Sequence, residues 1–170
     1  YGSIASRYTK ALARSMASTK EIKAANILNN ATSNTDPYGG GDGVALLSAS
    51  HPTTNGNQSN TLATAADLSE TSLESMLIQI ADMKDDRGLR IAAQGTTLII
   101  PTAYTFTAER LLESQLRTGT ADNDINAIRN GGYLPQGYHI MRRLTDSDAF
   151  FILTDVPDGM KMFQRSPMKK

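Results

Sequence analysis

The sequence predicts an α+β fold rather than a doubly wound parallel sheet. Three observations lead to this class. A long uninterrupted amphipathic stretch stands near the N-terminus, a short apolar run ends in proline at residues 96–101, and two further strand-like runs follow towards the C-terminus. Because helical and extended patterns do not alternate regularly, repeated strand–helix–strand units are not expected.

The N-terminal stretch predicts one long helix over residues 6–30. Neither glycine nor proline interrupts it, and at 1.5 Å per residue it would extend about 35 Å. Such a basic amphipathic helix is a solvated surface helix, a spine across an assembly subunit, or a membrane-surface helix. The narrow, Ala-rich stripe without Trp or Phe disfavours the membrane interpretation. The stripe follows steps of three and four through Tyr8, Leu12, Met16, Thr19, Ile22, Ala25 and Leu28.

Residues 29–66 predict a long polar loop. They contain the glycine-rich run at 39–43, the turn-forming Asn55-Gly56-Asn57, and many Ser and Thr residues. The only apolar cluster, at 44–47, is expected to form a short strand or an anchor. A loop of this length in a compact domain usually carries function or an interface.

The second predicted helix covers residues 67–86, and two N-caps fit its start. With Asp67 as N-cap, Glu70 would complete a capping box. With Ser69 as N-cap, Leu68 and Leu73 would form a hydrophobic staple instead. Both alternatives describe the same element. Its expected buried face consists of Leu73, Met76, Leu77, Ile80 and Met83.

The remaining predicted elements are shorter. We expect strands at 96–101, 138–143 and 149–154, helices at 107–116 and 125–130, a turn at 156–159, and a return strand at 160–164 pairing with 150–154. In the third helix, Leu111, Leu112 and Leu116 are expected to face inward. Asp122 is expected to act as the N-cap of the short helix that follows the polar loop.

Composition and charge exclude several classes of protein. The chain has 170 residues, of which 39% are apolar, enough for a core. It has no cysteine, which excludes disulfides, thiol nucleophiles and cysteine-bound metals, and no apolar run of about 18 residues that would span a membrane. The 17 basic and 17 acidic residues give a net charge of zero. With few aromatic residues, this balance argues against sequence-specific nucleic-acid binding.

The charges are nevertheless segregated along the chain. Residues 1–23 carry five basic residues and one acid, and residues 24–83 carry six acids without any Lys or Arg. Residues 84–170 carry twelve basic and ten acidic residues. Opposite charges on different segments of a neutral chain are what we expect of a subunit that contacts copies of itself.

The search for catalytic and cofactor motifs predicts neither a cofactor nor a metal. Neither of the two histidines accompanies a Gly-x-Ser-x-Gly elbow, and the glycines at 39–43 are not followed by the lysine of a phosphate-binding loop. Residues 122–126 imitate the start of a calcium loop. However, Ala127 and Tyr133 stand where that loop requires glycine and glutamate.

Eight short segments stand in one order and together span nearly the whole chain. They are residues 20–29 (KEIKAANILN), 41–52 (GDGVALLSASHP), 85–88 (DDRG), 98–101 (LIIP), 107–110 (TAER), 119–127 (GTADNDINA), 144–151 (LTDSDAFF) and 158–165 (DGMKMFQR). In this order they resemble tailed-phage major capsid, or major head, proteins.

The resemblance implies the Hong Kong 97-type capsid fold. Residues 1–90 would form part of a peripheral domain with the spine helix at about 6–30, the polar loop and the second helix. Residues 91–155 would form the axial domain, and residues 156–170 would return to the peripheral domain. The N-terminal arm and extended loop that precede the spine helix in that family are not in this sequence. Since the chain also begins at Tyr1, we expect an interior piece of a longer polypeptide.

The resemblance also implies a function without catalysis. The protein would be a structural major capsid protein that self-assembles into the icosahedral shell enclosing the phage genome. Its partners would be copies of itself in pentamers and hexamers, portal, scaffolding or decoration proteins, and packaged DNA through non-specific contacts, with no membrane. It would be located in the virion after assembly in the host cytoplasm. Arg117, Asp122 and Asp124 are the candidate intersubunit contacts, in a loop expected near the capsomer centre.

Three other interpretations stay open at this point. The first keeps the fold but makes the chain an encapsulin-like nanocompartment shell protein that holds cargo enzymes. The second is a small hydrolase that uses His51 with Asp42, with Ser48 or Ser50 as the neighbouring hydroxyl. The third is a tail or decoration protein of the virion.

Overall fold

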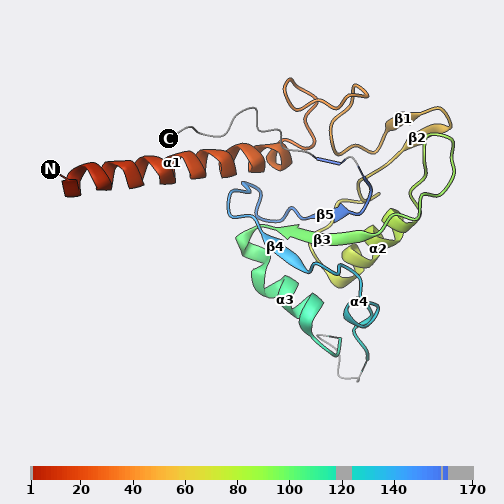
Figure 1. Ribbon diagram of the computed structural model, residues 1–170. Coiled ribbons are helices and arrows are strands. Elements are labelled where there is room, and N and C mark those ends of the chain that lie inside the picture. The colour runs from red at the N-terminus through yellow and green to blue at the C-terminus, as the bar shows by residue number, and fades with distance from the viewer. Residues whose placement is uncertain (1, 118–123, 158, 161–170) are drawn as a thin grey trace.

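A computed structural model describes residues 2–117, 124–157 and 159–160. It shows a mixed α and β body from which one long helix projects (Figure 1). The elements are α1 (Gly2–Asn29), β1 (His51–Thr53), β2 (Gly56–Gln58), α2 (Glu70–Ala81), β3 (Gly95–Ile100), the 3₁₀ turn η1 (Thr102–Tyr104), α3 (Thr105–Glu113), α4 (Ala127–Asn130), β4 (Tyr138–Ile140) and β5 (Phe151–Thr154). This element content confirms the predicted α+β class.

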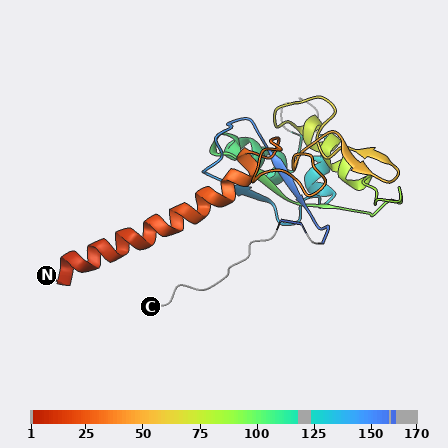
Figure 2. The same cartoon turned by 90° about the horizontal axis from the view of Figure 1, so that it is seen from above.

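Helix α1 is the predicted N-terminal helix, and it begins four residues earlier than expected. Figures 1 and 2 show it extending away from the body as one straight rod. Residues 3–17 are all exposed, and of the predicted apolar stripe only Ala25 and Leu28, near the C-terminal end, are buried. The stripe therefore has no partner within the described chain over most of its length.

The C-terminal end of α1 is tied to the body through Asn29. Its Nδ2 donates a hydrogen bond of 3.0 Å to the carbonyl oxygen of Arg143, and its Oδ1 accepts one of 3.0 Å from the backbone N–H of Thr145. Farther along the helix, Arg143 Nη2 donates to Ser18 Oγ at 2.9 Å. These contacts join the helix to the segment that leads into β5.

The body is built around a three-stranded sheet in the order β4-β3-β5. Strand β3 pairs in parallel with β4 and antiparallel with β5, so that Leu98 lies opposite Tyr138 on one side and Ile152 on the other. Strand β4 ends at Ile140, three residues before its predicted end. The reason is that Pro101 ends β3, so the bond from Met141 N–H to the Ile100 carbonyl is the last between these strands.

The core lies between this sheet and helices α2, α3 and α4, which stand on one side of it in Figure 1. Its buried members are Leu68, Leu73, Leu98, Ile100, Ala108, Leu111, Leu112, Ile128 and Leu134. Packing is tight at Gly95, where an added Cβ would lie 2.9 Å from Leu77 Cδ2 and 3.0 Å from Ile152 Cγ2. Any side chain at that position would force these neighbours apart.

Of the two predicted caps of α2, the structure contains the one at Ser69. Ser69 Oγ accepts a hydrogen bond from the Ser72 N–H, and Ser72 Oγ accepts one from the Ser69 N–H, so serine takes the place of the usual acidic partner. The helix ends at Ala81, five residues earlier than predicted. Beyond it the carboxylate of Asp85 accepts bonds from two backbone N–H groups and forms a turn instead.

Two predictions about the next helices are wrong. Leu116 does not face inward and is 47% exposed, because α3 ends at Glu113 and Leu116 lies beyond it in a bridge to Ile125. The N-cap of α4 is Asn126 rather than Asp122. Its side-chain Oδ1 accepts hydrogen bonds from the N–H groups of the second and third residues of the helix.

The polar loop contains a short hairpin that the sequence did not predict. Strands β1 and β2 pair antiparallel, with His51 opposite Gln58, and Gly56 takes a φ of 106° at the turn. Within the 44–47 cluster, Ala45 is buried and forms an isolated bridge with Gly39, so this cluster is an anchor rather than a strand. The predicted return strand at 160–164 lies outside the described residues from 161 onwards.

Candidate functional site

The loop predicted to make intersubunit contacts has a well-defined base. Leu116 and Ile125 form an antiparallel bridge, and the backbone N–H of Arg117 donates to the carbonyl oxygen of Asp124 at 2.9 Å. Next to this pair in the sequence, Asn126 Nδ2 donates hydrogen bonds to the carbonyl oxygens of Leu111 and Ser114. The base thus joins the end of α3 to the start of α4, on the side of the sheet away from α1 (Figure 1).

Arg117 makes an ion pair within its own chain. Its Nε donates a hydrogen bond of 2.8 Å to Oε2 of Glu70, the first residue of α2. This hydrogen bond raises the pKa of Arg117 above its ordinary value. The other two predicted contact residues differ: Asp124 is exposed, and Asp122 lies outside the described residues. The structure therefore brings Arg117 and Asp124 together at the backbone and holds the Arg117 side chain against α2.

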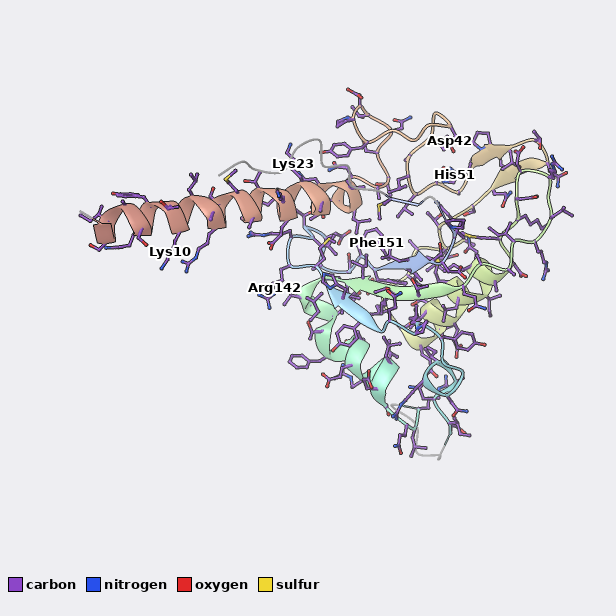
Figure 3. All side chains as sticks on the ribbon, viewed as in Figure 1. Lys10, Lys23, Asp42, His51, Arg142 and Phe151 are labelled. Carbon is purple, nitrogen blue, oxygen red and sulfur yellow. The ribbon has the colours of Figure 1, made fainter. Side chains whose placement is uncertain are left out.

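Asp42 and His51 form a close pair in the polar loop, as Figure 3 shows. His51 Nδ1 lies 2.6 Å from Asp42 Oδ2, and this hydrogen bond is the main reason why the pKa of Asp42 is lowered. A hydrolase would need a hydroxyl at Nε2 of the same ring. In the part of the chain that is described, Nε2 is buried without a partner, and Ser48 Oγ instead accepts from the N–H of Ser50. The predicted pair exists, but no described serine completes it.

A broad groove of about 1450 Å³ lies beside the base of α1, and we call it the acidic groove. Phe151, labelled in Figure 3, is one of the residues along it. Its apolar lining includes Leu28, Leu47, Leu62, Met76, Ile80, Met83, Ile91, Phe150, Phe151, Leu153, Val156 and Met160. Its acidic lining consists of Asp67, Asp146, Asp148 and Asp155, all of them exposed. No Lys or Arg stands among the described residues that line it.

The negative charge of the acidic groove is concentrated at Asp146 and Asp148. The backbone N–H of Asp148 donates to Oδ1 of Asp146 at 3.3 Å. Hydrogen bonding between the two carboxyl groups lowers the pKa of Asp146 and raises that of Asp148, and the charge of Asp67 raises the latter further. Over the described residues none of these three side chains has a salt bridge to a basic group.

The free half of α1, residues 3–17, carries the opposite combination of properties. Three large apolar side chains, Ile4, Tyr8 and Leu12, are 55%, 73% and 63% exposed. Arg7 and Lys10 lie within two turns of Ile4 and Tyr8, on an arc of the helix beside the one that carries these apolar side chains. Figure 3 shows Lys10 on the part of α1 that is remote from the body.

Sequence reasoning predicted the basic amphipathic helix and missed the acidic groove. Asp67 is distant in the sequence from Asp146 and Asp148, and only the fold brings it to the same surface. The one available signal was the absence of Lys and Arg from residues 24–83. Within the described ranges there is no group of side chains that could hold a metal ion and no helix apolar and long enough to cross a membrane.

Comparison with protein families gives a match over nearly the whole sequence. A family model described as "Phage capsid protein" matches residues 1–168, which is nearly the entire sequence. No curated protein and no solved structure matches the chain significantly.

Proposed function

The chain belongs to the phage capsid protein family, and from this premise we propose that it is the major capsid subunit of a tailed phage with the Hong Kong 97-type fold. Membership of the family makes it a structural protein of the virion. In our proposal many copies assemble, without any bond being made or broken, into the icosahedral shell that encloses the genome. Assembly takes place in the host cytoplasm.

One observation carries the step from capsid protein to shell-forming subunit. Helix α1 leaves the body as a rod, and the apolar side chains of its residues 3–17 are exposed in the described chain (Figure 2). A monomer in water gains nothing by holding such a surface exposed, whereas contact with neighbouring copies would bury it. The exposed stripe is therefore what we expect of a subunit whose apolar surface is buried by contact with other subunits.

The proposed domain arrangement follows the capsid fold. Residues 1–90, with α1 as the spine helix, form part of the peripheral domain. Residues 91–155, which include the three-stranded sheet and α3, form the axial domain around the capsomer centre. Residues 156–170 return to the peripheral domain. The direction of α1 away from the sheet supports a spine helix that is separate from the axial sheet, whereas α2 shares the core of that sheet.

Intersubunit contacts at the capsomer centre are assigned, in this proposal, to the loop with Arg117, Asp122 and Asp124. Two observations support it: Asp124 is exposed, and the base of the loop lies on the side of the sheet away from α1. Contacts between different patches of identical subunits close into rings such as pentamers and hexamers. Portal, scaffolding or decoration proteins and the packaged DNA, bound non-specifically, complete the set of partners.

Electron microscopy of the purified full chain tests the proposal. We expect closed shells of uniform diameter, each built from hundreds of copies. Particles that contain only a few copies would instead identify a tail or decoration protein. Shells that co-purify with a cargo enzyme and package no DNA in infected cells would identify a nanocompartment. Dispersed monomers under all assembly conditions would contradict the proposal.

A further inference from the structure

We propose that the free half of α1 of one copy docks into the acidic groove of a second copy. The inference rests on the proposed function, because it names two surfaces through which the subunits associate. It goes beyond that function by pairing residues 3–17 with one surface on the neighbour.

The helix contributes an apolar stripe with positive charge along one side. Arg7, Lys10 and Arg14 recur in steps of three and four, which places them on one side of the helix. This basic side lies next to the exposed arc that carries Ile4, Tyr8 and Leu12, so a groove that covered the apolar arc would also reach the basic groups at its edge. No salt bridge within the described chain involves these three basic side chains.

The acidic groove offers the complementary combination. Its lining is largely apolar, with residues such as Phe151 and Met76, while Asp67, Asp146 and Asp148 supply exposed carboxylates. A basic amphipathic helix laid into such a groove buries its apolar side and pairs its charges. The pairing of opposite charges selects this partner over a random apolar surface and gives the contact its salt dependence.

The helix cannot reach the groove of its own chain. Leu28, at the C-terminal end of α1, lines the groove, and α1 continues from there without a break to Gly2. At 1.5 Å per residue, Tyr8 stands about 30 Å from Leu28 along the helix axis. Figures 1 and 2 show the helix pointing away from the body in both views. The groove that receives residues 3–17 must therefore belong to another copy.

Docking of this kind is head-to-tail. Each copy gives one helix and receives one, so the two contacting surfaces differ and the contact is heterologous. Such a contact generates rings when the rotation between copies closes, and open chains when it does not.

Charge reversal on each surface provides the test. A helix variant of the full chain carries Arg7→Glu, Lys10→Glu and Arg14→Glu, and a groove variant carries Asp67→Lys, Asp146→Lys and Asp148→Lys. We expect each variant alone to self-associate about tenfold or more weakly than the wild type in sedimentation velocity. Mixing the two should restore association, because each reversed surface then meets its complement. High salt, about 1 M, should weaken the wild-type contact.

A matched control reverses charge on the same helix outside its free half. Lys20→Glu with Lys23→Glu should leave association at the wild-type level. Circular dichroism of the helix variant should show unchanged helix content, since residues 3–17 are all exposed in the described chain. A photoreactive residue at position 151 should crosslink to residues 3–17 of another copy. Crosslinking to residues 161–170 of the same chain would overturn the docking.

The remaining outcomes separate this inference from the proposed function. If the wild type forms shells and the helix variant does so equally well, or if the mixture stays dispersed, the docking is overturned and the shell function stands. If the helix variant loses affinity for a DNA fragment but associates normally, the basic side chains serve DNA and the docking is overturned. A wild type that never associates overturns both.

Discussion

Arg117 and Glu70 are joined by a hydrogen bond of 2.8 Å although they are 47 residues apart in the sequence. The bond fastens the base of the predicted contact loop to the first turn of α2. Glu70 is the less exposed partner, at the N-terminal end of a helix, where a carboxylate is favoured. Arg117 can therefore affect assembly through symmetry mates or through this internal contact, and the two roles can be separated.

We expect Arg117→Glu to impair capsomer formation while the chain stays folded. The substitution puts two carboxylates together in the chain and reverses a charge that faces symmetry mates in our proposal. The double variant Glu70→Arg with Arg117→Glu restores the internal pair and should not restore capsomers. Native mass spectrometry measures the oligomers, and urea unfolding measures the stability of each variant.

The double variant decides between the two roles. If it forms pentamers and hexamers as readily as the wild type, Arg117 acts only through Glu70. The assignment of Arg117 to an intersubunit contact would then be wrong.

Asn126→Ala should destabilise the chain by about 1–3 kcal/mol. The buried amide caps α4 and also donates to the carbonyl oxygens of Leu111 and Ser114. Removing it leaves these groups without their partners. Chemical denaturation measures the change, and the exposed Asn130→Ala, in the same helix, should change the free energy of unfolding by less than about 0.5 kcal/mol. Equal effects of the two substitutions would refute the capping role.

Leu98→Ala should cost about 2–5 kcal/mol of stability, because Leu98 is completely buried in β3 at the centre of the core. The control is Ile78→Ala in α2, where the side chain is exposed and the expected loss is below about 0.5 kcal/mol. Thermal and urea unfolding of both variants give the comparison. A small loss at Leu98 would show that the sheet does not pack on α2 and α3 as described.

The Asp42–His51 pair predicts a specific dependence of stability on pH. The hydrogen bond from His51 holds the pKa of Asp42 below its ordinary value in the folded chain. Protonation is therefore harder in the folded than in the unfolded state. The stabilisation from Asp42 is fully present above about pH 4 and is lost as the pH falls through the lowered pKa.

Unfolding of Asp42→Asn at a series of pH values tests this expectation. The variant should be less stable than the wild type above about pH 4, and the difference should shrink at lower pH. Asp36→Asn, on the same loop, serves as the control and should follow the wild-type curve. A difference between Asp42→Asn and the wild type that stays constant down to about pH 2 would refute the pair's contribution.

Local patterns predicted the elements whose boundaries depend on nearby residues. The uninterrupted stretch predicted α1, Pro101 marked the end of β3, and Ser69 was one of two proposed caps for α2. The β1–β2 hairpin was missed because its polar strands show no alternation of apolar residues, although the Asn-Gly pair at its turn was noted. Patterns of this kind contain no information on which distant strands pair.

The candidate surfaces were predicted less completely for the same reason. The sequence showed a basic helix and an acidic segment, but not that Asp67 would stand beside Asp148 or that Arg117 would bind Glu70. Those neighbours are set by packing between elements far apart in the chain. The cap of α4 was misplaced because Asp122 and Asn126 are both residues that favour this position, and only the buried contacts of Asn126 decide between them.

Because α1 is attached to the body near Asn29, its C-terminal residue, a small rotation there moves the N-terminal end of the helix by a large distance. A rotation of about 10° at Asn29 displaces a point on the helix by roughly 5 Å if that point lies about 30 Å from Asn29 along the helix axis. A slight rearrangement of the bonds from Asn29 to Arg143 and Thr145, together with the bond from Arg143 to Ser18, would thus change the angle between neighbouring copies, while the sheet and its core kept their packing. The same polypeptide can in this way meet surfaces of different curvature by adjusting only a few side chains.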